Sequence, residues 1–371
     1  MENSIFALCE NNTGGSSFHR RGSADQGVKI ALDATYSVGE ELSGIGVYSQ
    51  EIIKGLACAY AQCDWLCCYR PHRILRSLSR PLPPAARRRL LTDKWSPDAH
   101  LFHGLNQRLP HTRYQREVTT FHDLFVMTAE YSSPGFRARF SAQARTAADR
   151  SDLIVCVSQF TASQVVNLLG VPLERTRVIH HWVRFPVAGV DTASSNREPI
   201  VLSVSAIQHR KNTLRLIEAF ERTPPGWRLL LVGSSGYGAE AVYSRLAQSP
   251  RRAAIELTGY VTDAQLLDLY RRASIFSFPS LDEGFGMPVL EAMACGLPVL
   301  ASNVSALPEV CGDAAVLVDP RDTDALADGL TRLMHNDSLR ADLRARGLAR
   351  ASQFTWESAI RKTWQVYQEL L

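Results

Sequence analysis

Two acids, Glu283 and Glu291, stand at the two ends of the stretch EGFGMPVLE. The apolar run SIFSFPS before this stretch lacks polar alternation, which is typical of a strand buried on both faces. The glycines should then lie in a loop at the carboxyl end of that strand, where α/β sheets bind ligands. Pro288 suits the first position of a helix and Gly296 its end, so Glu291 is expected in the first helical turn.

Such a loop and helix start could bind a phosphorylated ligand. Backbone N–H groups there can donate to phosphate oxygens, and the helix dipole assists them. Glu291 could accept two hydroxyl hydrogen bonds, as the ribose acid of Rossmann proteins does, and Glu283 could reach a group beyond the phosphates. Alternatively, Glu291 only complements the dipole, worth about 0.3–1 kcal/mol, and Glu283 is a solvated loop acid. If either acid stood alone, this alternative would be favoured. Because both acids occur together within the glycine and proline pattern, a ligand-binding site is favoured instead.

The elements that would position these acids alternate between short β-branched runs and helical stretches, which predicts parallel α/β sheets. In the first half, strands are expected at VKIALDA, DWLCCY, AHLFHGL, EVTTFHDL, LIVCVSQ and RVIHH. Helices are expected at 48–60 after the loop SGIGVYSQ, from 134 behind a Ser133 cap, and at 158–170. The second half repeats this order, with strands at PIVLSVSA, RLLLVG, AIELTGYV, IFSFPS, PVLAS and AAVLVDP, and helices at 212–221, 239–248, 263–272, from 288 and from 322.

This repetition predicts an α/β fold of two Rossmann-like domains that face a cleft. The expected boundaries are a disordered leader at 1–27, a first domain at 28–184, a linker at 185–198, a second domain at 199–352, and a C-terminal helix at 353–371 that crosses back to the first domain.

Composition excludes several classes of protein. Of the 371 residues, 45% are hydrophobic and 21% charged, as in soluble globular proteins. No apolar run approaches the roughly 20 residues of a membrane-spanning helix, and the N-terminus, with its acid Glu2, is a poor signal peptide. The eight cysteines include no CxxC pair and no histidine partners at zinc spacing, so reduced thiols in a cytoplasmic chain are expected.

Positive charge is concentrated between Tyr69 and Trp95, where one acid, Asp93, faces eight basic residues: Arg70, Arg73, Arg76, Arg80, Arg87, Arg88, Arg89 and Lys94. One interpretation is a solvated, arginine-rich helix pair. The other is attraction to an anionic surface, either a membrane leaflet or a phosphate-bearing acceptor. Nucleic acid is disfavoured, because no aromatic interleaving or recognition motif accompanies the charge.

The stretch FPSLDEGFGMPVLEAMACGLPVLAS closely resembles the E-x7-E signature of the retaining, two-Rossmann (GT-B) glycosyltransferases of family 4, group 1. The resemblance runs roughly from Lys29 to Ala351. DATYSVGEELSGIGVYSQEI is similar to the family's N-terminal loop and helix, TTFHDL to its histidine strand, VSQFTASQV to its VSxxS strand and helix, and RKNTLRLIEAF to its basic pyrophosphate motif.

The resemblance implies roles for particular residues. Glu283 would bind hydroxyls of the donor sugar, His122 would lie across the cleft near donor and acceptor, and Arg210 and Lys211 would neutralise the departing diphosphate. Glu291 would hold the ribose of a nucleotide sugar. The other implied donor-binding residues are Gly44, Gly46, Ser205, Gly233, Tyr260, Val261, Gly284, Phe285, Gly286, Met287, Pro288, Val289 and Leu290.

Without the resemblance, several of these residues have simpler explanations. A lone histidine at a strand end, such as His122, is usually a satisfied polar residue. The stretch HRKN could be a surface pair at a helix start, and Gly44 and Gly46 could only terminate a turn.

The sequence departs from the family pattern at two places. Most relatives carry Gly-Arg where this chain has Ser205-Ala206, so one diphosphate cation is missing or supplied by Arg210. A similar change occurs in a branch rich in bacterial mannosyltransferases, which slightly favours GDP-mannose over a UDP sugar. Where relatives often have Asn-Gly-Val-Asp, this chain has His180-His181-Trp182-Val183, which changes the contacts near the hinge.

The resemblance implies a retaining hexosyltransferase that acts on a carbohydrate or lipid-linked hydroxyl acceptor in bacterial polysaccharide or glycolipid assembly. The first domain would bind the acceptor and the second the nucleotide sugar. No trustworthy DxD pair ends a strand, so a metal-independent enzyme is expected, with Arg210, Lys211 and the helix N-terminus in place of a divalent cation. The chain is expected to be cytoplasmic. Alternatively, it binds peripherally to the anionic inner face of the membrane. The rival functions are a nucleotide-sugar epimerase of the same fold and a non-catalytic subunit, whereas the lack of GxGxxG disfavours a dinucleotide oxidoreductase.

Overall fold

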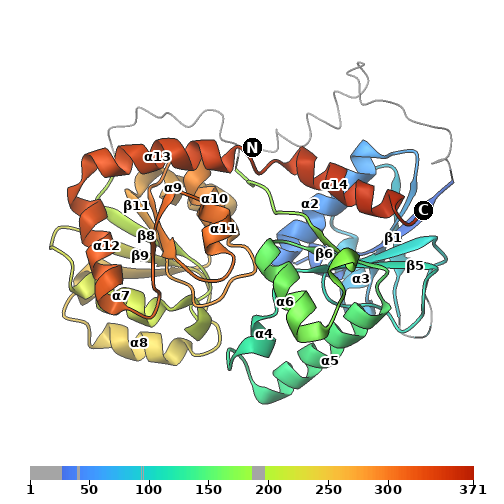
Figure 1. Cartoon of the computed structure of the whole chain (residues 1–371), viewed down its shortest axis with the longest axis horizontal. Helices are drawn as coiled ribbons and strands as arrows, with labels where there is room; N and C mark the ends of the chain where they lie inside the picture. Colours follow the sequence, from blue (N-terminus) through green and yellow to red (C-terminus); the bar gives the residue numbers. More distant parts are fainter. Residues whose placement is uncertain (1–26, 40–41, 93, 95, 186–196) are drawn as a thin grey trace.

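The computed structural model describes residues 27–39, 42–92, 94, 96–185 and 197–371. The predicted leader, apart from its last residue, and positions 186–196 of the predicted linker lie outside these residues. The described residues form two α/β units, each built on one parallel sheet (Figure 1). The prediction of two Rossmann-like units is therefore confirmed.

In the described part of the chain, the first unit has a seven-stranded parallel sheet in the order β3-β2-β1-β4-β5-β6-β7. At its centre, Ala31 pairs with Leu66 on one side and with Phe102 on the other. The strands are β1 (Lys29–Asp33), β2 (Asp64–Tyr69), β3 (Ala86–Leu90), β4 (Leu101–Gly104), β5 (Arg116–Phe121), β6 (Leu153–Cys156) and β7 (Thr176–Val178). The helices and 3-10 turns are η3 (Thr35–Ser37), α2 (Gly44–Ala59), α3 (Pro71–Ser77), α4 (Phe125–Thr128), α5 (Pro134–Arg150), α6 (Gln159–Leu169) and η4 (Leu173–Arg175).

The second unit has a six-stranded parallel sheet in the order β10-β9-β8-β11-β12-β13 within the described residues. The strands are β8 (Ile200–Val204), β9 (Arg228–Val232), β10 (Ile255–Gly259), β11 (Ile275–Phe278), β12 (Val299–Ser302) and β13 (Ala315–Val318). The helices and 3-10 turns are η5 (His209–Lys211), α7 (Thr213–Glu221), α8 (Ala239–Ala247), η6 (Arg252–Ala254), α9 (Asp263–Arg272), α10 (Met287–Ala294), α11 (Leu307–Cys311), α12 (Thr323–His335), α13 (Asp337–Ala351) and α14 (Trp356–Gln368).

Helices cover both faces of the second sheet, which explains why its strands are apolar throughout. Leu202 and Phe276 point to a cluster formed with α9, α10 and α11. Val201 and Ile275, next to them in the chain, point to the opposite cluster formed with α7, α8 and α12. Because side chains alternate along a strand, burial of both faces requires the continuous apolar runs of the sequence.

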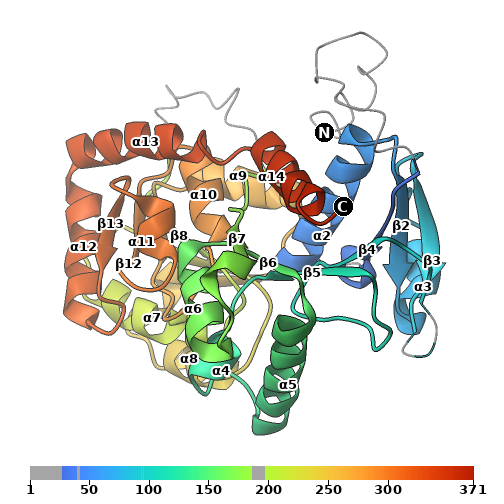
Figure 2. The ribbon, with the colours of Figure 1, turned by 45° about the vertical axis from the view of Figure 1, so that its right-hand side comes forward.

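The last helix, α14, leaves the second unit and packs on the first, beside α2 in both views (Figures 1 and 2). The Trp364 ring stacks on Tyr60 with centroids 4.1 Å apart. The Tyr367 hydroxyl lies 2.6 Å from His103 Nδ1 on the central strand β4. The chain end is thus part of the first unit's core, so the two units are joined by two stretches of chain.

Some element predictions were wrong. Helix α2 begins at Gly44 rather than near Tyr48, because the Ser43 side chain accepts the N–H of Gly46 and caps the helix before the two glycines. The basic segment is one short helix, α3, and one edge strand, β3, rather than a helix pair. The stretch from 322 is helical as predicted, with a separate last helix, and it is further divided at Asn336, so that Asn336 and Thr355 each cap a new helix.

Among the described residues, none of the helices combines the length and the apolar character required to cross a membrane.

Candidate functional site

The loop that carries Glu283 lies directly against the first unit. A Cβ at Gly284 would overlap the carbonyl oxygen of His122, so only glycine permits this approach. The hydroxyls of Ser158 and Thr161, at the start of α6, donate to the Gly284 carbonyl at 2.6 and 3.1 Å. The end of β11 therefore meets the ends of β5 and β6 across the domain interface.

Glu283 is buried between two cations. Its Oε1 contacts Lys211 Nζ and lies 3.1 Å from Arg210 Nη1. Burial would raise the pKa of Glu283, but Arg210 and Lys211 outweigh it and lower the pKa to about 2. Burial, assisted by Arg210, lowers the pKa of Lys211 to about 8. All three groups are therefore charged at neutral pH.

The sheet topology brings these charges together. Arg210 and Lys211 lie on the 3-10 turn η5, beyond the carboxyl end of β8, and Glu283 lies beyond the end of the neighbouring strand β11. Strand β8 is where the strand order reverses, the point at which open α/β sheets bind ligands. Asn212, at φ 60°, ends the turn, and its amide donates to the carbonyls of Pro279 and Pro320 at 3.0 and 2.7 Å. This side chain fixes the basic turn to the loops that surround it.

Two further carboxylates surround the charge cluster. Burial raises the pKa of Asp123 to about 6, and Glu283 and Asp282 add to this effect while Arg210 opposes it. Burial also raises the pKa of Asp282, whose Oδ2 accepts from the Thr128 hydroxyl at 3.0 Å. The Arg210 guanidinium lies 4.0 Å from the centre of the Phe125 ring on α4, in cation–π geometry. Residues of the first unit thus complete the site formed by the second.

His122 follows β5 and is buried. Its Nε2 lies 2.9 Å from the carbonyl oxygen of Leu105, so this nitrogen carries the proton when the ring is neutral and Nδ1 is the acceptor. Burial lowers the pKa of His122 to about 4, so the ring is uncharged at neutral pH. The ring stacks on His181 at 5.4 Å and meets the edge of Tyr48 at 4.7 Å.

The N-termini of α2 and α10 meet across the interface. A Cβ at Gly44 would lie 2.8 Å from Met287 Cε, and one at Gly46 would lie 2.9 Å from the Tyr36 carbonyl oxygen. Gly286, at φ 103°, turns the loop into α10. The positive ends of two helices and the Arg210 and Lys211 turn therefore bound one region, which suits a ligand with several negative charges.

Glu291 is buried on α10, and hydrogen bonds hold both of its oxygens. Arg184 Nε donates to Oε1 at 2.9 Å, and the Tyr270 hydroxyl donates to Oε2 at 3.0 Å. Burial raises the pKa of Glu291, and Arg184 is the strongest influence in the opposite direction. The helix begins at Met287, so Glu291 is its fifth residue and lies in the second turn, not in the first turn as the sequence predicted.

The remaining residues of the implied donor site spread along the same edge of the second sheet. Ser205 and Gly233 follow the adjacent strands β8 and β9, and a Cβ at Gly233 would overlap the Ser205 carbonyl. Tyr260 is 49% exposed after β10, and Val261 beside it is half-buried. On α10 and the loop before it, Pro288 is half-buried, whereas the side chains of Phe285, Val289 and Leu290 are buried in the core.

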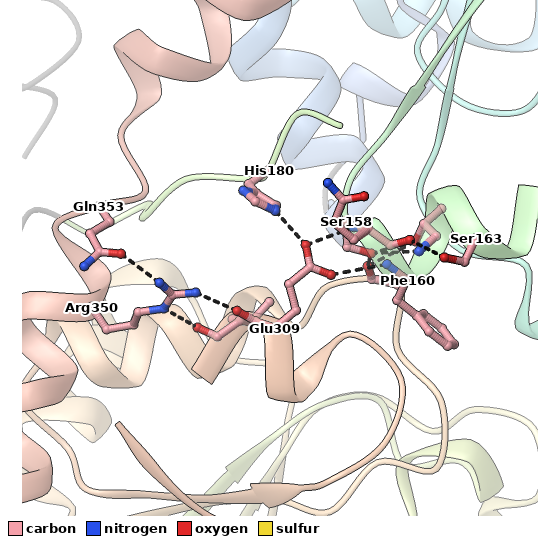
Figure 3. Close-up of polar contacts among 11 residues, drawn as sticks. Ser158, Phe160, Ser163, His180, Glu309, Arg350 and Gln353 are labelled. Atoms are coloured by element: carbon pink, nitrogen blue, oxygen red, sulfur yellow. Dashed lines mark hydrogen bonds and ion pairs between the residues drawn. The ribbon is translucent and has the colours of Figure 1, made fainter. Parts of the chain in front are cut away.

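Sequence reasoning assigned no role to the segment after β7, yet it contacts both units. His180 Nε2 lies 2.7 Å from Glu309 Oε1, and Glu309 also accepts the N–H groups of Gln159 and Phe160 at 2.9 and 3.2 Å (Figure 3). Burial would raise the pKa of Glu309, but His180 and these N–H groups lower it. An acid of α11 thus caps α6 of the other unit. The sequence feature that could have revealed these contacts is the presence of His180-His181-Trp182-Val183 where relatives often have Asn-Gly-Val-Asp.

Across the part of the chain that the structure describes, His, Cys, Asp and Glu side chains form no group of three or more that could hold a metal ion.

Two parallel-sheet units with a charged site between them define the double-Rossmann fold, and solved structures share this fold. Sucrose-phosphate synthase from Thermosynechococcus elongatus superimposes with a TM-score of 0.75 at 22% identity, over 93% of this chain and 99% of that one. Anabaena HepE in complex with UDP-glucose superimposes with a TM-score of 0.72 at 17% identity, over 92% and 99%.

Sequence comparison assigns the family. The model for "Glycosyl transferases group 1" matches residues 190–350, and that for "Glycosyltransferase Family 4" matches residues 42–185. O-antigen chain mannosyltransferase B of Escherichia coli is 35% identical over 285 residues, which is 73% of this chain and 74% of the relative. The serotype-specific mannosyltransferase WbdA of Escherichia coli is 28% identical over 275 residues, 69% of this chain but 34% of the relative. The chain belongs to the GT-B glycosyltransferases of group 1, family 4.

Proposed function

We propose that this glycosyltransferase transfers a hexose, with retention of configuration, from a nucleotide-diphosphate sugar to a hydroxyl acceptor. GDP-mannose is the first candidate donor, because the similar relatives include O-antigen and serotype-specific mannosyltransferases. A carbohydrate or lipid-linked acceptor in bacterial polysaccharide assembly follows from the same relatives. The observation that carries the proposal is the buried cluster of Glu283, Arg210 and Lys211 at the reversal of the strand order.

In the proposed reaction, the bond between the sugar C1 and the diphosphate oxygen breaks, and the acceptor oxygen bonds to C1 on the same face. The acceptor proton passes to the departing diphosphate, so no carboxylate pair astride the sugar is needed. Arg210 and Lys211 stabilise the charge that develops on the diphosphate, in the role that a divalent cation has in other enzymes. Glu283 is ionised and accepts hydroxyl hydrogen bonds from the sugar instead of donating a proton.

A thermal-shift screen against GDP-, UDP- and ADP-sugars tests donor binding, because a ligand that binds the folded chain raises its melting temperature. We expect GDP-mannose to give the largest shift, with EDTA leaving it unchanged. Analysis of the products then separates the rivals: transfer to the acceptor supports the proposal, interconverted nucleotide sugar indicates an epimerase, and binding without turnover indicates a non-catalytic subunit. Absence of a shift with every donor would contradict the proposal.

We further propose that α3 contacts an anionic membrane, which would bring a lipid-linked acceptor to the first unit. Leu75 and Leu78 on and beside this helix are 77% and 66% exposed, and Arg76 beside them is also exposed. Exposed leucines among basic residues suit an interface with acidic headgroups. Of the basic side chains on β3, Arg88 and Arg89 donate to backbone carbonyls and Arg87 faces Asp64 at 3.6 Å, so α3 carries the proposed contact.

The double variant Leu75→Ser, Leu78→Ser is expected to lose most of its binding to phosphatidylglycerol vesicles in a sedimentation assay. Leu173→Ser is the matched control, because Leu173 is 66% exposed elsewhere on the same unit. Equal binding by both variants would contradict membrane contact through α3.

A further inference from the structure

The acid expected to hold the ribose is itself held by an arginine from the segment between the units. Arg184 Nε donates to Glu291 Oε1 at 2.9 Å, and its Nη1 lies 2.8 Å from Asp263 Oδ1 at the start of α9. The Arg184 side chain is 22% exposed and that of Glu291 only 7%. This is a nearly buried, charge-assisted contact, of the kind that is strong and geometrically specific.

The backbone around Arg184 is fixed. The N–H of Val183 donates to the Phe354 carbonyl at 3.1 Å, which ties the first linking stretch of chain to the second. The Arg184 guanidinium lies 4.5 Å from the centre of the Phe185 ring, which is buried in the core of the second unit. The arginine is therefore presented to Glu291 from a restrained position.

The charges around this arginine come from three helices. They are Glu291 on α10, Asp263 on α9 and Glu51 on α2 of the first unit. Burial raises the pKa of Glu51 and Arg184 is among the groups that lower it, so the arginine also acts across the interface. It is the shared counter-charge of acids from both units.

The contacts leave Glu291 free to bind a diol. An ionised carboxylate has about four acceptor positions, and Arg184 and Tyr270 each occupy one of them. The remaining positions match the two hydroxyls of a ribose. Burial raises the pKa of Glu291 and so favours the protonated acid, which has fewer acceptor positions, whereas Arg184 at 2.9 Å favours the ionised form.

We propose that Arg184 is a positioning residue for the ribose of the donor: it orients Glu291 and supplies its counter-charge. The inference rests on the proposed use of a nucleotide sugar. The alternative is that Arg184 occupies the position of the ribose and must leave when the donor binds. Removal of the arginine would then tighten donor binding.

The test compares a nucleoside diphosphate with its 2′-deoxy analogue, because only the ribose hydroxyls report on Glu291. Calorimetry on the full chain first identifies which of GDP, UDP and ADP binds most tightly. We expect the wild type to prefer the ribose form over its 2′-deoxy analogue by about tenfold or more, as a hydrogen bond to a charged group contributes. Arg184→Gln should reduce this preference to less than about threefold, and Arg184→Lys should restore part of it.

Arg177→Gln is the matched control, since Arg177 precedes the same segment but pairs with Glu369 at the surface. This variant should keep the wild-type preference for the ribose form. The nucleotide should also raise its melting temperature as much as it raises that of the wild type. If Arg184→Gln keeps the wild-type preference for the ribose form, or binds that form more tightly than the wild type does, the inference is overturned while the proposed function stands. If the wild type binds none of the three nucleotides, the proposed function fails and the inference fails with it.

Discussion

Replacing Glu283 by glutamine is expected to destabilise the fold substantially, because the carboxylate compensates two buried cations. Its Oε1 contacts Lys211 Nζ and lies 3.1 Å from Arg210 Nη1, and the three side chains are between 8% and 12% exposed. Glutamine keeps the shape of the side chain and removes only the charge. The variant therefore removes the carboxylate that contacts both cations, in a site that water barely reaches, and leaves Asp123 and Asp282 as the remaining acids there.

The magnitude follows from the pKa of Glu283, which is lowered from 4.5 to about 2. Lowering the pKa by about 2.5, at about 1.4 kcal/mol for each pKa unit, gives about 3.5 kcal/mol of stability at pH 7. Because the folded-state pKa lies below the unfolded-state value, this stability is present above pH 4.5. It is lost as the pH falls from there toward about 2.

Urea unfolding at pH 7 measures the effect on the wild type, Glu283→Gln, Lys211→Met and the double variant. We expect a loss of about 3.5 kcal/mol for Glu283→Gln, and a double variant less destabilised than the sum of the single changes by about 2 kcal/mol, as interacting charges require. Glu256→Gln is the control, because its surface pair with Arg228 should contribute less than about 1 kcal/mol. Additive single changes, or equal losses for Glu283→Gln and the control, would refute the reasoning.

Three other outcomes are expected. Gly284→Ala should lower kcat/KM at least about tenfold in a steady-state assay, because its Cβ would overlap the His122 carbonyl, whereas Gly135→Ala, with open space around its Cβ, should leave the rate unchanged. Glu309→Gln should lower the free energy of unfolding in urea by about 1 kcal/mol, because the cap of α6 loses its charge. The distance between fluorophores on the two units should also increase, and an unchanged distance would count against the role of Glu309 as a link between them. Burial lowers the pKa of Lys211 to about 8, so kcat/KM should fall about tenfold per pH unit above pH 8 as the cation is lost, and a profile flat to pH 10 would contradict this.

Much of the site could be predicted because each motif follows a strand. Lys211 and Glu283 are far apart in sequence, but both come directly after apolar runs that form parallel strands. The carboxyl ends of parallel strands meet at one edge, so these residues had to be near each other once β8 and β11 paired. The same reasoning placed His122 at the facing edge of the first sheet.

The contacts made by the linking segment could not be predicted in this way. Arg184 meets Glu291 and His180 meets Glu309 only because the two units are docked, and no local periodicity encodes that docking. The start of α2 was misplaced for a different reason. Gly44 and Gly46 lower helix propensity, but the Ser43 cap offsets that cost, and the close approach of Met287 leaves no room for a Cβ at Gly44.

The central claim, transfer of a hexose by the Glu283, Arg210 and Lys211 site, is tested most directly with GDP-[14C]mannose and a synthetic lipid-linked acceptor. The wild type should release GDP and form a labelled product whose anomeric configuration, determined by NMR, is that of the donor. Glu283→Gln should lose at least about a hundredfold in this transfer, while Leu173→Ser retains it. An inverted product, or full transfer by Glu283→Gln, would contradict the account.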